Sequence, residues 1–171
     1  GGPCIAAESD AGRVREPNED CVGTPRRMGI PDHLLLARGT LLAVADGMGG
    51  HAAGEVASQH AVEVLYSTYY TDPSPGLADS LRRAVERANA EIYALGSGGV
   101  ETLGLGTTMV AALLIQDDLI VANVGDSRAY LVRRGRARQV SRDHSWVAES
   151  LRAGLIDEQQ AREHTLRNVI T

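Results

Sequence analysis

The chain has 171 residues, 43% of them hydrophobic and 23% charged, which suits one globular domain with a sizeable core. Its net charge of −5 argues against a general nucleic-acid binder, and no apolar stretch reaches membrane-spanning length. All seventeen basic residues are arginine, which excludes a Schiff-base lysine and a Walker-type phosphate loop.

The amino-terminal half alternates apolar runs with breaks. Strands are predicted at 4–10, 19–23 and 40–46, and the last, a continuous apolar run, is predicted to be buried on both faces. The interval 24–38 has two prolines and no clear periodicity, which predicts a surface loop. Helical spacing predicts helices over 52–70 and 77–95, separated by the Pro/Gly break at 72–76.

The carboxy-terminal half is predicted to be mostly strands. Four strand-like runs, at 105–115, 118–125, 127–134 and 136–140, are joined by hairpin-sized connections, which predicts an antiparallel meander. Two short helices follow, the first capped by Ser145 or Asp143 and the second by Asp157. This order of elements favours α+β layers over alternating βαβ units.

Three carboxylates lie at or beside the ends of predicted strands: Asp20, Asp46 and Asp126. Each also has a purely structural interpretation, as part of a turn, a charged loop or a hairpin tip. If their strands share a sheet, however, the carboxylates converge, and only a cation would relieve their repulsion. Gly47 would let the backbone approach such an ion closely enough for its carbonyl to bind. Glu19 would point away from the ion or support it through water.

Arginines provide the candidate anion-binding groups. Arg15, five residues before Asp20, can present a planar fork to a phosphate. Five more lie between Arg133 and Arg142, where we expect the solvated face of edge strands. Docking of acidic phosphopeptides is the second interpretation of this tract, and nucleic-acid binding is a distant third because no aromatic platform accompanies it. Cys4 and Cys21 have no metal-binding spacing and suggest reduced thiols in a cytoplasmic protein.

Taken together, six segments resemble the bacterial branch of the metal-dependent protein phosphatases, the protein phosphatase 2C family. They are ESDAGRVREPNEDCVG, LLAVADGMGGHAAGEVAS, GLGTTMVAALL, VANVGDSRAYLVRRG, SRDHSWV and HTLRNVIT. The resemblance implies a single partial catalytic domain over 1–171. Its α+β fold would pack two antiparallel sheets as a sandwich flanked by helices, in α-β-β-α layers.

The same resemblance implies a serine/threonine phosphoprotein phosphatase in which two ions, Mn²⁺ or Mg²⁺, activate water for one-step hydrolysis. Asp46 would bridge the ions, and Gly47 would add its carbonyl. Asp20 and Glu19 would act through the metal-water shell, and Asp126 would belong to a weaker third metal position. Arg15 would hold the substrate phosphate.

Other residues receive supporting roles. Thr107 and Thr108 would be structural residues of a core strand, and Arg128 a partner for a carboxylate. Met48 occupies the place where animal relatives have histidine, so His51 is a candidate general acid, although a loop or capping role is favoured for it. The implied partners are phosphoserine and phosphothreonine proteins, including a bacterial serine/threonine kinase and its substrates, with no nucleic acid and no membrane.

The resemblance also sets a limit. Family domains continue beyond the RNVIT-like segment with strands that carry two more metal aspartates. We therefore expect these 171 residues to bind metal weakly and turn over poorly, and open sheet edges to favour self-association. The alternative is a non-catalytic module of the same fold that binds a partner or phosphoprotein. A different two-metal hydrolase, such as a nuclease, is the least favoured interpretation, because the net negative charge of the chain argues against nucleic-acid binding.

Overall fold

The computed structural model describes residues 2–13, 18–49, 53–97, 104–167 and 169–171. Its largest part is an antiparallel sheet in the order β1-β2-β4-β5, with the short β3 paired to the end of β2. The strands are β1 (Asp20–Gly23), β2 (Thr40–Met48), β3 (Gly106–Thr107), β4 (Met109–Ile115) and β5 (Asp118–Val124). A separate hairpin pairs β6 (Tyr130–Arg133) with β7 (Arg136–Gln139).

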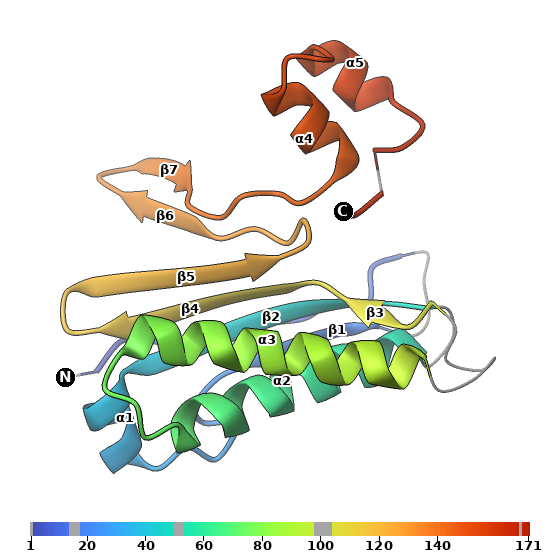
Figure 1. Ribbon diagram of the computed structural model, residues 1–171. Helices are drawn as coiled ribbons and strands as arrows, with labels where there is room; N and C mark the ends of the chain where they lie inside the picture. The colour runs from blue at the N-terminus through green and yellow to red at the C-terminus, as the bar shows by residue number, and fades with distance from the viewer. Residues whose placement is uncertain (1, 14–17, 50–52, 98–103, 168) are drawn as a thin grey trace.

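Two long helices cover one face of the main sheet (Figure 1). They are α2 (Ala53–Thr71) and α3 (Leu77–Gly96), within one residue of the predicted ranges. The residues that α2 buries extend beyond a narrow stripe and include three tyrosines, Tyr66, Tyr69 and Tyr70. Tyr66 and Tyr70 hydrogen-bond main-chain carbonyls of Leu41 and Gly39, so these phenols anchor the helix to the start of β2.

The opposite face of the main sheet is only partly covered. Leu41, Ala43 and Ala45 are 0–3% exposed beneath α2, whereas Val44 between them is 41% exposed. The prediction that 40–46 is buried on both faces is therefore wrong; one face packs on helices and the other borders a hollow of about 350 Å³. Leu42 and Val110 line this hollow, and Tyr130 of β6 lies on its far side.

Two further predictions for the amino-terminal half are wrong. Residues 4–10 form no strand, because no described strand pairs with them; they border the same hollow as an exposed segment. The predicted loop at 24–38 contains α1 (Asp32–Arg38). None of its residues is fully buried, although Leu34 and Leu35 pack against the core, and the helix begins after Pro31 and ends before Gly39, whose φ is 82°.

The predicted meander is present in two parts. β4 pairs with β5 and β6 pairs with β7, but within the described ranges β5 and β6 do not pair. Gly125 and Asp126 lie in the bent connection between these parts and are not a hairpin tip. The chain thus has an α+β fold with two antiparallel sheets, and the second sheet consists of one hairpin in the described residues.

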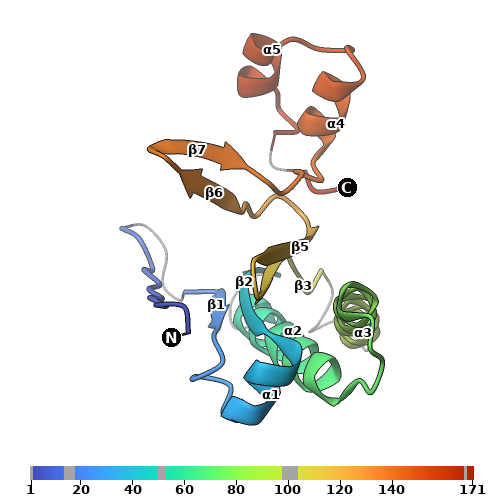
Figure 2. The ribbon, with the colours of Figure 1, turned by 90° about the vertical axis from the view of Figure 1, so that its left-hand side faces the viewer.

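The carboxy-terminal helices form a unit that stands apart from the main sheet (Figures 1 and 2). Ser145 caps α4 (Trp146–Arg152), and Asp157 caps α5 (Glu158–Glu163) through a capping box with Gln160, as predicted. The Trp146 and His164 rings stack with centroids 4.3 Å apart. None of the helices in the described part of the chain is long and apolar enough to cross a membrane.

Candidate metal centre

Two of the predicted metal ligands are cross-strand neighbours. Asp20 at the start of β1 lies directly opposite Asp46 in β2. Opposed residues of an antiparallel pair have Cβ atoms about 4.5–5.5 Å apart, and two like charges in this position are destabilising. Both residues are exposed, so an ion from solvent can reach them. A divalent cation between them would turn this repulsion into attraction, and hard carboxylate oxygens suit Mn²⁺ or Mg²⁺.

Gly47 allows α2 to begin against β2. A Cβ built on Gly47 would overlap the main-chain carbonyl of Gly54 and would lie 2.8 Å from the carbonyl oxygen of Glu19. The Gly47 amide donates a hydrogen bond to that same Glu19 oxygen, over 3.1 Å. Gly47 is therefore required by a close approach of three backbone segments. Its predicted role as a carbonyl ligand stays a prediction.

Glu19 and Asp20 have different surroundings, as expected for successive residues of an extended segment. The Glu19 carboxylate packs beside the first turn of α2, because a Cβ built on Gly54 would lie 2.7 Å from Glu19 Cδ. The carbonyl oxygen of Glu19 also accepts a 2.6 Å hydrogen bond from the Ser58 hydroxyl. These contacts fix the backbone that presents Asp20 to Asp46.

Thr107 and Thr108 hold the main chain of Asp46. The Thr108 amide donates to the Asp46 carbonyl over 2.9 Å, and the Asp46 amide donates to the Thr108 hydroxyl over 3.1 Å. The Thr107 hydroxyl donates to the same carbonyl over 3.0 Å. The structural role predicted for both threonines is thus specific: they set the position of one candidate ligand. The sequence signal is a Thr-Thr pair before an apolar strand, which by itself indicates only a strand.

Asp126 is connected to this site indirectly. The hydroxyl of Ser127 hydrogen-bonds the hydroxyl of Thr108, which in turn binds the Asp46 amide. Asp126 itself is half-buried and faces a hollow of about 560 Å³ that α4 and α5 also line. Among the described residues, no three His, Cys, Asp or Glu side chains form a group that could hold a metal. A third metal position at Asp126 therefore stays a prediction.

Arg128 has the carboxylate partner that was expected. Its Nε and Nη2 donate to the same Asp143 oxygen over 2.9 and 2.6 Å, and this pairing raises the pKa of Arg128. Gln139 donates to the other Asp143 oxygen over 2.6 Å. The next residue, His144, donates its amide to the Gly125 carbonyl, so this network holds the connection that carries Asp126.

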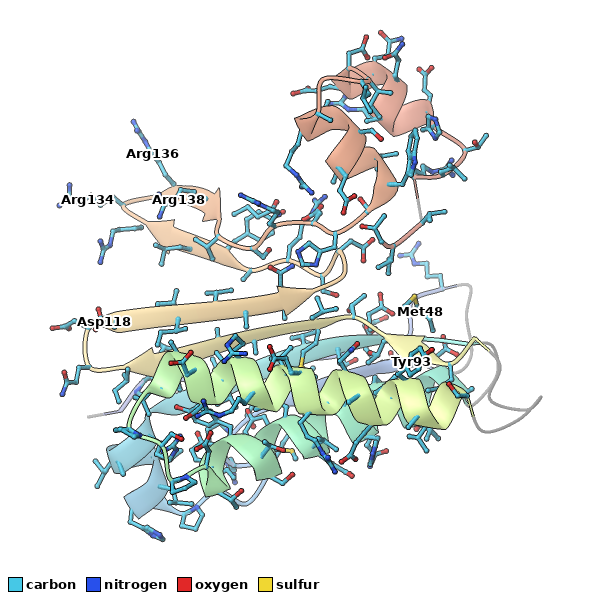
Figure 3. The ribbon with its side chains drawn as sticks, viewed as in Figure 1. Met48, Tyr93, Asp118, Arg134, Arg136 and Arg138 are labelled. Atoms are coloured by element: carbon cyan, nitrogen blue, oxygen red, sulfur yellow. The ribbon has the colours of Figure 1, made fainter. Side chains whose placement is uncertain are left out.

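Two predicted site residues, Arg15 and His51, lie outside the described residues, so their predicted roles remain predictions. Met48 is described: it lies two residues after Asp46 in β2, on the same side of the strand, and is 38% exposed. Figure 3 places Met48 at the end of the sheet opposite Asp118. The candidate centre therefore lies at one end of the main sheet, where β1, β2 and β3 meet.

An α+β fold with paired carboxylates at a sheet end defines a candidate metal-dependent enzyme, and comparison with known proteins identifies its family. Residues 8–150 match the protein phosphatase 2C family, so the chain belongs to that family, as the resemblance predicted. It is 37% identical over 166 residues to the serine/threonine phosphatase stp of Listeria monocytogenes, covering 95% of this chain and 63% of that protein. It is 38% identical over 165 residues to the serine/threonine protein phosphatase PstP of Mycobacterium tuberculosis, covering 96% and 30%.

Solved structures agree with this assignment. A crystal structure of the Mycobacterium tuberculosis phosphatase PstP matches with a TM-score of 0.78 and 38% identity, covering 97% of this chain and 65% of that one. The catalytic domain of PstP in complex with two manganese ions matches with a TM-score of 0.73 and 38% identity, covering 91% and 62%. The chain thus spans about 63% of the length of the stp relative and about 65% of the first PstP structure.

Proposed function

We propose that the chain belongs to a serine/threonine phosphoprotein phosphatase that requires two ions, Mn²⁺ or Mg²⁺, and acts in the cytoplasm. The observation that carries the proposal is the cross-strand pairing of Asp20 with Asp46 in a member of the protein phosphatase 2C family. The relatives at 37–38% identity are named serine/threonine phosphatases, and one related structure contains two manganese ions. Two such ions would acidify a shared water and neutralise phosphate charge.

The site residues of this chain would have separate roles in binding metal, binding phosphate and donating a proton. Asp46 would bridge the ions, with the carbonyl of Gly47 beside it, and Asp20 and Glu19 would bind through water. Arg15 would hold the phosphate, His51 is the candidate proton donor, and Asp126 would serve a third ion. In this proposal the β6–β7 hairpin belongs to the second sheet of an α-β-β-α sandwich, and the apolar residues around the 350 Å³ hollow are its interior. Its substrates would be phosphoserine and phosphothreonine proteins, including a bacterial kinase and its substrates.

The test measures the binding of Mn²⁺ to the chain by calorimetry and by electron paramagnetic resonance. Asp46→Asn is expected to weaken Mn²⁺ binding at least tenfold, because it removes the central charge of the pair. Asp118→Asn, an equal charge change at the exposed start of β5, is the matched control and should leave binding unchanged. An equal loss of Mn²⁺ affinity in both variants would contradict a metal site at Asp46. Phosphate release from a phosphothreonine peptide, measured with and without Mn²⁺, tests the reaction itself.

The second candidate is a module of the same fold that binds a phosphoprotein or partner without turnover. It is favoured by the finding that within the described ranges only two predicted ligands face each other, with no third in a common group. Binding of the phosphothreonine peptide with no phosphate release at saturating Mn²⁺ would support this candidate over the enzyme.

A further inference from the structure

The β6–β7 hairpin is an amphipathic ribbon with one basic face. Arg133 lies opposite Arg136, and Arg138 lies opposite Leu131. Because side chains alternate along a strand, these three arginines share one face, and Tyr130 and its alternate neighbours share the other. Tyr130 lines the hollow above the main sheet, so the arginine face is turned away from it. Figure 3 shows Arg136 on the side of β7 away from the main sheet.

The arginines of this hairpin have no partner among the described residues. Arg133, Arg134, Arg136 and Arg138 are all exposed, and none makes a hydrogen bond or ion pair there. Other arginines do: those of α3 pair with Asp72, Glu86 and Glu91, and Arg128 pairs with Asp143. In a chain of net charge −5, this ribbon is therefore a local concentration of unneutralised positive charge.

Two features of the ribbon reduce its own stability. Arg133 and Arg136 are like charges placed directly opposite each other. Arg134 and Gly135 have φ of 52° and 72°, the pattern of a type I′ turn, in which asparagine or glycine is favoured at the first position. No ion pair within the described ranges offsets either cost. A fold that needed only a hairpin here would favour other residues, so the arginines point to a ligand outside the chain.

We propose that this face binds an acidic, extended segment of a phosphoprotein substrate, away from the phosphate that is removed. The identity of the partner as a substrate rests on the proposed function. Arg136 and Arg138 are two residues apart on one strand, about 7 Å, which is also the spacing of alternate carboxylates in an extended peptide. Arginine forks bind carboxylates through two parallel hydrogen bonds, so the match is geometric as well as electrostatic.

The position of the ribbon sets where the acidic residues should lie. Figure 3 shows Arg134 at the same end of the molecule as Asp118, with Met48 at the other end. Thr40 of β2 lies opposite Leu114, next to the Ile115–Asp118 pair, and the seven residues from Thr40 to Asp46 cover the distance to the candidate centre, about 23 Å at 3.3 Å per residue. An extended peptide needs about seven residues to cover the same distance. The acidic segment should therefore lie about seven residues from the phosphorylated one.

An acidic peptide fits the ribbon better than other anions do. The arginine face of the hairpin carries one apolar side chain, Leu131 opposite Arg138, and because it is half-buried it offers little apolar surface to enter a bilayer. Stacking of nucleic-acid bases needs an aromatic side chain on the basic face, and the hairpin's Tyr130 lies on the other one.

The experiment measures fluorescence anisotropy of a labelled peptide with alternating glutamates and no phosphate, so it does not depend on catalysis. The Arg133→Gln, Arg136→Gln, Arg138→Gln triple variant is expected to weaken binding at least tenfold. The control is the triple Arg82→Gln, Arg87→Gln, Arg162→Gln, which makes the same charge change on exposed helix faces and should weaken binding less than twofold. Circular dichroism checks that both triples remain folded.

Three results would overturn the proposal: an equal loss in the control triple, equal binding of a glutamine version of the peptide, or tighter binding to phosphatidylserine vesicles or single-stranded oligonucleotide. If the chain or its longer relatives release phosphate, the hairpin triple should lower kcat/KM for a phosphothreonine peptide with glutamates seven residues away. It should leave turnover of p-nitrophenyl phosphate unchanged. Absence of all phosphate release would count against the proposed function and leave the anisotropy result to decide on docking.

Discussion

Replacing Gly47 with alanine tests how the candidate metal centre is built. The new Cβ would overlap the Gly54 carbonyl and would lie 2.8 Å from the Glu19 carbonyl oxygen, and both groups belong to backbone. Backbone atoms cannot rotate away, so β2 and the first turn of α2 must separate. Overpacking commonly costs about 1–3 kcal/mol, and we place Gly47→Ala at the upper end, about 3 kcal/mol. For a domain of this size, the loss corresponds to a fall in Tm of about 6–12 °C.

The assay is urea and thermal unfolding followed by circular dichroism, with Gly106→Ala as the control. Gly106 lies in β3 opposite Met48, and a Cβ there would meet only the flexible end of Met48, at 3.4 Å. Its free energy of unfolding should therefore change by less than about 0.5 kcal/mol. A Gly47→Ala variant as stable as the Gly106→Ala variant would refute the claim that three backbone segments meet at Gly47.

Three further predictions concern packing, the support of Asp20, and pH. Tyr66→Phe removes a buried hydrogen bond to a β2 carbonyl and should cost about 1–2 kcal/mol in urea unfolding, whereas Tyr93→Phe, at a site 77% exposed, should cost nothing measurable. Ser58→Ala removes one of the two hydrogen bonds to the Glu19 carbonyl and leaves only that from the Gly47 amide, so Mn²⁺ affinity by calorimetry should fall several-fold; an unchanged affinity would remove Ser58 from the support of Asp20. Hydrogen bonds from Ser74 and Arg83 hold the pKa of Asp72 below its ordinary 3.8, so its contribution to stability is complete above that value and is lost as the pH falls toward the folded-state pKa. The Tm difference between the parent and Asp72→Asn should thus shrink from pH 5 to pH 2, and a constant difference would contradict the linkage.

Local patterning predicted the helices and most strands because their signals are carried by neighbouring residues. The apolar stripes of α2 and α3 set their ranges, and Ser145 and Asp157 cap the short helices as expected. The prediction of a loop at 24–38 is wrong because α1 has only seven residues, too few to show a periodicity: Leu34 and Leu35 are partly buried against the core, and the Pro31 start and the Gly39 stop are the clearest signals. Residues 4–10 have the composition of a strand, but a strand also needs a partner, which sequence patterning does not provide.

The sequence predicted the carboxylates of the candidate centre. It did not predict the residues whose hydrogen bonds hold the backbone of these carboxylates in place. Asp46 ends an apolar run and Asp20 closes a polar stretch just before one, and the register of β1 and β2 confirms that they meet. The roles of Ser58 and Thr108 depend on contacts between segments 39 and 62 residues apart, which no spacing rule contains. The prediction of two buried faces for 40–46 failed because apolar content indicates what a face can bury, while the described residues cover only one face.

The stacking of Trp146 on His164 has a practical consequence for spectroscopy. Trp146 is the only tryptophan of the chain, and it belongs to the helical unit that stands apart from the main sheet. Three of the five tyrosines belong to α2 and are instead packed together in the core. Emission excited at 295 nm will therefore record the opening of the carboxy-terminal helices, and near-ultraviolet dichroism of the tyrosines the loss of the core. Melting curves from the two signals need not coincide, so a midpoint taken from tryptophan alone would describe the periphery of this molecule.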